Sequence, residues 1–198
     1  MADITASLFA DLEQQNLDQS QPLAARMRPK QLSEFTGQRH LLDEGKLLRR
    51  MIDAKRIGSV ILSGPPGTGK TTLANLIATA VGAELRILSA VSSGVKDVRE
   101  VLSWARDVVA SGGTRPILFI DEIHRIPKTV EEYLYSAMED YRIDIMIDQG
   151  PNARSVRLDI PRFTLIGATT RVGLLTSPMR SRFTLQTRLD YYGRDDLT

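Results

Sequence analysis

The sequence predicts an α/β fold in which helices flank a mainly parallel β-sheet. Three short, mainly apolar runs, at 60–62, 85–88 and 116–120, alternate with two segments, 73–80 and 95–109, whose apolar residues recur at three- and four-residue spacing. The runs have the length of strands, and the spaced segments have the pattern of helices that bury one face. Strands that alternate with helices are joined by crossovers, which connect parallel strands. The 198 residues, 42% of them hydrophobic, suffice for one substantial core.

The link between the first run and the first helical segment, residues 64–71, matches the phosphate-loop pattern G-x-x-x-x-G-K-S/T. In this pattern backbone N–H groups surround phosphate oxygens, the lysine, here Lys70, reaches the β- and γ-phosphates, and the hydroxyl of Thr71 ligates Mg²⁺. The positive N-terminal end of the following helix faces the phosphates. A glycine turn beside an exposed lysine would need neither the strand before it nor the helix after it. We therefore expect ATP and Mg²⁺ to bind here. The expected nucleotide contacts are Gly64, Pro65, Pro66, Gly67, Thr68, Gly69, Lys70, Thr71 and Thr72.

An acidic pair ends the third run. Asp121 and Glu122 directly follow 117–120, a continuous apolar run typical of a strand buried on both faces. Ligands bind at the carboxyl ends of strands in open α/β sheets, so both carboxylates fall on the side of the phosphate loop. We expect Asp121 to hold Mg²⁺ through water, and Glu122 to orient and deprotonate the attacking water. A solvated strand end also carries acidic residues, but next to a phosphate loop the pair predicts a Walker B motif and hydrolysis.

The segments around this centre complete the domain. Residues 1–21 are polar and predict a tail, and residues 22–198 predict the ATPase core. The segment 41–57 has one apolar helical face beside basic residues. After the acidic pair, 129–132 predicts a capping box at the start of a helix. A further buried strand at 163–168 leads to two threonines and then to a helix, with Ser177 as N-cap and Pro178 at its first position.

Between these helices, two alternating segments flank a turn that contains Gly150, Pro151 and Asn152. They predict a β-hairpin with one apolar face, formed by 143–147 and 156–160. The apolar face has two interpretations: it covers the core of this domain, or it is offered to another protein.

Composition excludes several classes of protein. The balance of 26 basic and 24 acidic side chains gives no overall field that demands a nucleic acid, so any DNA contact must come from local patches or from a ring of subunits. No apolar run has the length of a membrane span, and the N-terminus has no basic region followed by an apolar signal. The absence of cysteine fits a reducing cytoplasm, and two histidines do not make a metal cluster.

Together these motifs resemble those of the AAA+ ATPases, and of two bacterial families among them. From about residue 8 to 125 the chain resembles the RarA/MgsA family of clamp-loader-related ATPases, and from 117 to 198 it resembles the RuvB family of Holliday-junction branch-migration motors. The segments that match the RarA/MgsA family are 22–29, 37–38 with 40–42, and 89–97. The segments that match the RuvB family are 119–125, 131–135, 138–142, 144–147, 163–171 and 174–178.

The resemblance implies further roles. Thr169 matches sensor 1, with Thr170 next to it as the alternative, and Arg182 matches the arginine finger that acts on the nucleotide of the next subunit, with Arg180 as runner-up. It also implies self-association into a ring, a hexamer if RuvB-like or a tetramer if RarA-like, with branched DNA as substrate. Two segments acquire roles in the same way. Arg28 and Pro29 fall where such proteins approach the adenine, and the hairpin 141–160 matches the one that docks on RuvA.

Three hypotheses for the function follow. The first is a cytoplasmic ATP-driven motor subunit that acts on Holliday junctions in the manner of RuvB. The second is a RarA-like ATPase of replication forks, which would not bind RuvA. Both families continue into a helical lid, and RuvB adds a winged-helix domain, whereas this sequence stops at Thr198, where the lid is expected to begin. The third hypothesis is therefore an ATP-binding core with little turnover.

Overall fold

The structure is a computed structural model that describes residues 22–146 and 155–196. The chain divides into two units, Met1–Lys30 and Gln31–Thr198. In the first unit the structure describes one short helix, α2 (Leu23–Arg26). The tail expected at 1–21 lies outside the described residues.

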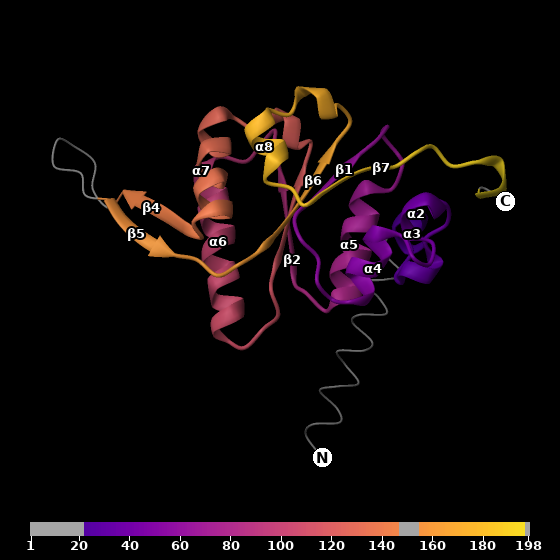
Figure 1. The fold of residues 1–198 in the computed structure, drawn as a ribbon, viewed down its shortest axis with the longest axis horizontal. Helices are drawn as coiled ribbons and strands as arrows, with labels where there is room; N and C mark the ends of the chain where they lie inside the picture. The colour runs from indigo at the N-terminus through magenta and orange to yellow at the C-terminus, as the bar shows by residue number, and fades with distance from the viewer. Residues whose placement is uncertain (1–21, 147–154, 197–198) are drawn as a thin grey trace, which may run out of the picture. The chain divides into compact units, whose positions relative to one another are not determined.

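A five-stranded parallel sheet forms the centre of this unit (Figure 1). Its strands are β1 (Val60–Ser63), β2 (Leu85–Ser89), β3 (Ile117–Asp121), β6 (Thr164–Thr169) and β7 (Leu185–Arg188). The order is β2-β3-β6-β1-β7, so β1 lies between β6 and β7, with Val60 opposite both Ile166 and Leu185. The predicted α/β fold with a parallel sheet is confirmed. Because all five strands run the same way, their carboxyl ends meet at one edge of the sheet.

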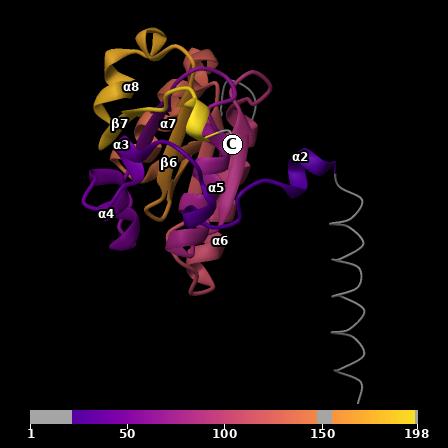
Figure 2. The ribbon, with the colours of Figure 1, turned by 90° about the vertical axis from the view of Figure 1, so that its right-hand side faces the viewer.

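Each face of the sheet carries its own hydrophobic cluster. Val60 and Leu62 pack with α3 (Arg39–Leu42), α4 (Leu47–Asp53) and α5 (Lys70–Val81). Ile61 points the other way, into the cluster formed by α6 (Val95–Ala110), α7 (Lys128–Glu139) and α8 (Ser177–Ser181). Figure 1 shows the two groups of helices on opposite sides, and in Figure 2 α5 lies in front of the sheet. Burial on both faces explains why the strand sequences are continuously apolar.

Two helices match their predicted extent closely. Helix α5 contains the predicted helical segment 73–80 and ends one residue beyond it, at Val81. Helix α6 spans the predicted segment 95–109 but buries Val108, whereas Val109, the last residue of that segment, is 38% exposed. Both valines lie within one turn of Ala105, and spacing alone does not decide which of them faces the sheet.

The predicted helix starts differ from the structure at two places. Helix α7 begins at Lys128, after Pro127 in an extended conformation, so the expected capping box at 129–132 lies within its first turns and does not form. Helix α8 has Thr176 as N-cap, one residue before the predicted Ser177, and the Thr176 hydroxyl accepts from the N–H of Met179 at 3.2 Å. Any of several hydroxyl residues near a helix start satisfies the same pattern.

The predicted helical segment 41–57 is in fact two short helices, α3 and α4, separated by a turn at Gly45, where φ is +83°. A residue other than glycine would be strained in this conformation. Strand β7 has no counterpart among the predicted elements. It is a four-residue edge strand in which Thr187 is the buried residue, so it lacks the apolar run that marks a buried strand.

The predicted hairpin is present at its base. Strands β4 (Arg142–Met146) and β5 (Ser155–Asp159) pair antiparallel, with Ile143 opposite Leu158. The expected turn at 150–152 lies outside the described residues. Ile143 and Ile160 are buried in the second hydrophobic cluster, whereas Val156 is 40% exposed. The base of the apolar face therefore covers this domain's own core, and Val156 is open to solvent.

In the part of the chain that the structure describes, no helix is long and apolar enough to cross a membrane.

Candidate nucleotide-binding site

The phosphate loop connects β1 to α5 at the carboxyl edge of the sheet, and it packs closely against the segment after β7. A Cβ on Gly64, where φ is +149°, would lie 2.3 Å from the carbonyl oxygen of Leu189. A Cβ on Gly69, where φ is +85°, would lie 2.9 Å from the hydroxyl of Tyr192. The N–H of Gly64 also donates to the carbonyl oxygen of Thr169 at 3.1 Å, which ties the loop to β6. Glycine is therefore required at these positions by the backbone and by its neighbours.

The loop presents unpaired backbone donors at the start of α5. Among the described residues, no protein acceptor takes the backbone N–H groups of residues 67–71, and the first bond of the helix runs from the N–H of Leu73 to the carbonyl oxygen of Gly69 at 2.7 Å. Unpaired N–H groups at a helix N-terminus, together with the helix dipole, form a site suited to an anion. This arrangement fits the phosphates that the sequence motif predicts.

Lys70 is folded back onto the loop. Its Nζ donates to the carbonyl oxygens of Gly64 at 2.9 Å and Pro65 at 2.7 Å, and the residue is 8% exposed. Burial lowers the pKa of the Lys70 ammonium, although the charges of Asp121 and Glu122 act in the opposite direction. The ammonium is thus close to both acidic residues of the predicted site, and a phosphate in the loop would give it an anionic partner.

The acidic pair lies where the sequence predicts it. Asp121 is the last residue of β3, and Glu122 follows in a left-handed conformation with φ +52°. The N–H of Glu122 donates to Oδ1 of Asp121 at 3.0 Å, so the carboxylate of Asp121 helps to hold the backbone that turns Glu122 out of the strand. Such a conformation is uncommon for a residue other than glycine and is found preferentially at functional sites.

A buried histidine joins β6 to this pair. His124 lies in η2 (Ile123–Arg125), with its Nδ1 2.8 Å from Oγ1 of Thr169 and its Nε2 3.4 Å from Oε2 of Glu122. Oγ1 of Thr169 also accepts from the N–H of Arg171 at 3.0 Å. His124 was not among the predicted site residues, because a lone histidine next to an acidic pair has no distinctive spacing. Only the fold brings Thr169 to it.

The two threonines at the end of β6 face different surroundings. Thr169 is fully buried and directs its hydroxyl at His124, whereas Thr170 is exposed and lines a cavity of about 430 Å³ beside the phosphate loop. The lining residues are Ser63, Gly64, Pro65, Pro66, Thr170, Val172 and Arg188. Arg188 was not expected at the site, since it ends the unpredicted strand β7. Of the two sensor candidates, Thr170 is the one that lines the cavity.

Arg182 is held by its own subunit. Its guanidinium lies 2.7 Å from the carboxylate of Glu139, donates to the carbonyl oxygen of Pro178 at 2.6 Å, and stacks 4.1 Å from the ring centroid of Tyr135. The side chain is 16% exposed. Arg180, the runner-up, makes a 3.4 Å contact with the hydroxyl of Ser177.

The Tyr135 hydroxyl donates to Glu131, and burial raises the pKa of that hydroxyl. The ring over which Arg182 stacks is therefore a neutral phenol at physiological pH, and its face favours a cation.

Arg28 and Pro29, the expected adenine contacts, belong to the first unit, so the geometry of the site does not include them.

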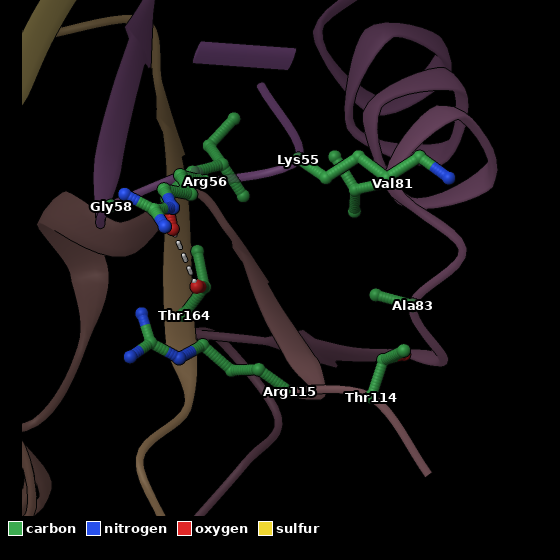
Figure 3. A pocket seen from close by; sticks show the side chains of 9 residues that line it. Lys55, Arg56, Gly58, Val81, Ala83, Thr114, Arg115 and Thr164 are labelled. Carbon is green, nitrogen blue, oxygen red and sulfur yellow. Dashed lines mark hydrogen bonds between the residues drawn. The ribbon is translucent and has the colours of Figure 1, made fainter. Parts of the chain in front are cut away.

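A separate cavity of about 550 Å³ lies at the opposite edge of the sheet. It is lined by Gly58, which precedes β1, by Thr164, which begins β6, and by three basic residues, Lys55, Arg56 and Arg115. In Figure 3 the guanidinium groups of both arginines lie beside Thr164, whereas Lys55 extends along Val81. Because the phosphate loop follows the other end of β1, this cavity is not part of the nucleotide site.

The residues at the phosphate loop fit a magnesium nucleotide. No group of three or more His, Cys, Asp or Glu side chains that could hold a metal ion occurs in the described ranges 22–146 and 155–196. Mg²⁺ does not need one, since it commonly binds through one or two protein oxygens and takes its other ligands from phosphates and water. Thr71 and Asp121 are the residues expected to supply protein oxygens to it.

A parallel sheet with a glycine-rich loop between β1 and α5, and an acidic pair after β3, defines a P-loop NTPase. Comparison with known proteins specifies the family. Residues 27–189 match the family model described as Holliday junction DNA helicase RuvB P-loop domain. The chain therefore belongs to the RuvB P-loop domain family.

Curated relatives and solved structures agree with this assignment. The chain is 51% identical over 175 residues to the Holliday junction branch migration complex subunit RuvB of Chlorobium phaeovibrioides, and 50% identical over 171 residues to that of Salinibacter ruber. These matches cover 86% and 85% of this chain and 48% of each relative. The Thermotoga maritima RuvB Holliday junction branch migration motor superposes with a TM-score of 0.66 at 40% identity, over 86% of this chain and 51% of that one. The chain thus spans about half the length of the curated relatives it matches.

Proposed function

We propose that this chain is the ATP-hydrolysing P-loop domain of a RuvB-type motor for Holliday-junction branch migration, acting in recombination and repair in the cytoplasm. The observation that carries the proposal is the convergence, at one edge of the sheet, of unpaired loop N–H groups, Lys70 and the acidic pair. Membership of the RuvB P-loop family supports the assignment to branch migration.

Each residue of the site has a proposed task. The loop N–H groups and Lys70 bind the phosphates of ATP, and Thr71 and Asp121 hold Mg²⁺, which neutralises charge on the phosphates. The carboxylate of Glu122 accepts the proton of the attacking water and orients its oxygen toward the γ-phosphate. Thr169 or Thr170 serves as sensor 1, and the open position of Thr170 beside the loop favours the latter. Arg28 and Pro29 contact the adenine.

Arg182 is proposed to act in trans on the ATP of a neighbouring subunit in a ring, which for a RuvB-type motor is a hexamer. Arginine fingers contribute about 10³–10⁵ in rate. In the single subunit, Glu139 and Tyr135 hold this guanidinium, so assembly must release it or shift the helix end that carries it.

The substrate and partner are proposed from the family. Branched DNA is the substrate, and a RuvA-like protein binds the hairpin formed by β4 and β5, on which Val156 offers an exposed apolar side chain. A RarA-like function, suggested by the resemblance of residues 8–125, is the alternative, although the family match from residue 27 onward extends through that region.

The test is the ATPase rate per subunit as a function of protein concentration, with and without four-way junction DNA and RuvA. A RuvB-type motor gives a rate that rises with concentration, responds to the junction together with RuvA, and collapses in Arg182→Ala. ATP binding without hydrolysis at every concentration would instead support a nucleotide-binding core with little turnover. An ATPase rate that RuvA does not change would support the RarA-like alternative.

A further inference from the structure

The imidazole of His124 is the side chain that connects β6 to the carboxylate of Glu122. It is 5% exposed and lies between the end of β3 and the start of α7. One ring nitrogen faces Thr169 at 2.8 Å and the other faces Glu122 at 3.4 Å. The ring therefore spans the distance between a residue of β6 and the proposed general base.

The chemistry of its neighbours determines which nitrogen carries the hydrogen. The Nε2 of His124 lies at ion-pair distance from the Glu122 carboxylate, 3.4 Å, and because a carboxylate only accepts, a neutral ring is expected to place its hydrogen on this nitrogen. In the neutral ring Nδ1 is then an acceptor, and the hydroxyl of Thr169 must donate to it. The oxygen of that hydroxyl accepts in turn from the N–H of Arg171 at 3.0 Å. This arrangement pairs Nδ1 with the Thr169 hydroxyl and turns the Nε2 hydrogen toward the carboxylate of Glu122.

The Glu122 carboxylate has few other constraints. Its backbone is fixed by the left-handed turn and by the bond to Asp121, but its side chain is 32% exposed. Within the described ranges, His124 is the one basic side chain at ion-pair distance from the carboxylate. A general base must lie within hydrogen-bond reach of the proton that it removes, and a misplacement of about 1 Å can cost about 10² in rate.

We propose that His124 is a positioning residue: Thr169 fixes its tautomer and orientation, and its Nε2–H holds the carboxylate of Glu122 in the direction of the attacking water. His124 does not contact the nucleotide. Through it, the end of β6, where Thr170 borders the phosphate-loop cavity, is mechanically linked to the general base. The inference rests on the proposed ATPase function.

The kinetic test compares His124→Phe, which keeps a ring of similar size without nitrogens, with Thr169→Val, which keeps the volume and removes the hydroxyl. Each is expected to lower kcat about 10- to 100-fold and to leave the dissociation constant for ATP within about twofold. The double variant is expected to be no slower than the slower single variant, because both substitutions break the same connection. His124→Gln, which retains a donor and an acceptor, should recover part of the rate. His40→Phe, the same change at the exposed histidine, is the matched control.

A second measurement does not depend on hydrolysis. The chain contains two histidines, so the ¹⁵N NMR spectrum of the imidazoles has two sets of signals, and His40→Phe assigns them. His124 is expected as the Nε2–H tautomer. Thr169→Val should shift its Nδ1 signal, and Glu122→Gln should shift its Nε2 signal.

The outcomes separate the two proposals. A parent chain that binds ATP and never hydrolyses it overturns the proposed ATPase, while the NMR signals still decide on the connection. An active parent with His124→Phe at full kcat, additive effects in the double variant, or an Nδ1–H tautomer would overturn the role of His124.

Discussion

Arg182 forms an ion pair with Glu139 of the same chain, with 2.7 Å between Nη2 and Oε1. The pair joins the end of α8 to the last residue of α7, and the ring of Tyr135 covers the guanidinium. To act as the proposed finger on a neighbouring subunit, Arg182 would have to leave these contacts or move together with the helix end that carries it. If the contacts have to be left, assembly of the proposed ring competes with an interaction inside each subunit.

Weakening the ion pair should favour the assembled state. Glu139→Gln is expected to raise the ATPase rate per subunit about two- to fivefold at subsaturating protein concentration, because a partly exposed pair is worth about 0.5–1 kcal/mol. Rates measured over a dilution series test this. Glu132→Gln, an exposed position on the same helix, is the matched control. Equal rates for Glu139→Gln and the parent at all dilutions would show that the pair does not restrain Arg182.

Because the phosphate loop packs closely on the segment after β7, alanine substitutions at two of its glycines should destabilise the fold by different amounts. Gly64→Ala places a Cβ against the Leu189 carbonyl and should lower the free energy of unfolding by roughly 2–4 kcal/mol. Gly67→Ala has open space around it and only the cost of its positive φ, about 1 kcal/mol. Urea unfolding of both variants measures the difference. Equal losses would mean that the loop and Leu189 are not in contact in solution.

Much of this site follows from local sequence, and the rest depends on the fold. The phosphate loop and the acidic pair were predictable because spacing within one loop and at one strand end encodes their chemistry. His124 and Arg188 were not, since each becomes part of the site only through strands distant in sequence. Strand β7 was not predicted, because an edge strand does not need a continuous apolar run. The N-cap at Thr176 was missed by one residue, because adjacent hydroxyl residues give the same signal.

The lowered pKa of Lys70 predicts a pH dependence of ATP binding. The charged ammonium binds phosphate, and burial makes it lose its proton below the ordinary lysine pKa of about 10.4 in the ATP-free chain. Bound phosphate stabilises the charged ammonium, so ATP binding is coupled to proton uptake by Lys70. The affinity for ATP is therefore expected to fall as the pH rises through the lowered pKa of Lys70. Titrations of fluorescent ATP between about pH 7 and 10 test the trend.

Two variants accompany this titration. Lys70→Arg keeps its charge over that range and should give a flatter profile, and Lys70→Ala should bind weakly throughout. A parent profile as flat as that of Lys70→Arg would contradict the assignment of the charge to Lys70.

If the hairpin is the docking surface, a substitution there should change the binding of RuvA and leave the binding of ATP unchanged. Val156→Asp places a charge on the exposed apolar position of β5 and should weaken binding of RuvA about tenfold, with ATP affinity unchanged. Arg157→Ser alters the neighbouring residue, whose side chain points to the other face of the strand, and should bind RuvA nearly as the parent does. Titration of labelled RuvA measures both. Unchanged binding of Val156→Asp would remove this surface from the interface.

The most direct test of the central claim, hydrolysis of ATP at the phosphate loop with Glu122 as the base, measures ATP affinity and single-turnover hydrolysis together in Glu122→Gln. The amide keeps the size of the side chain but is too weak a base to accept a proton from water. We predict parent-like affinity with hydrolysis reduced about 10²–10⁴-fold. Hydrolysis at the parent rate with ATP bound would show that Glu122 is not the base and that the account of this site is wrong.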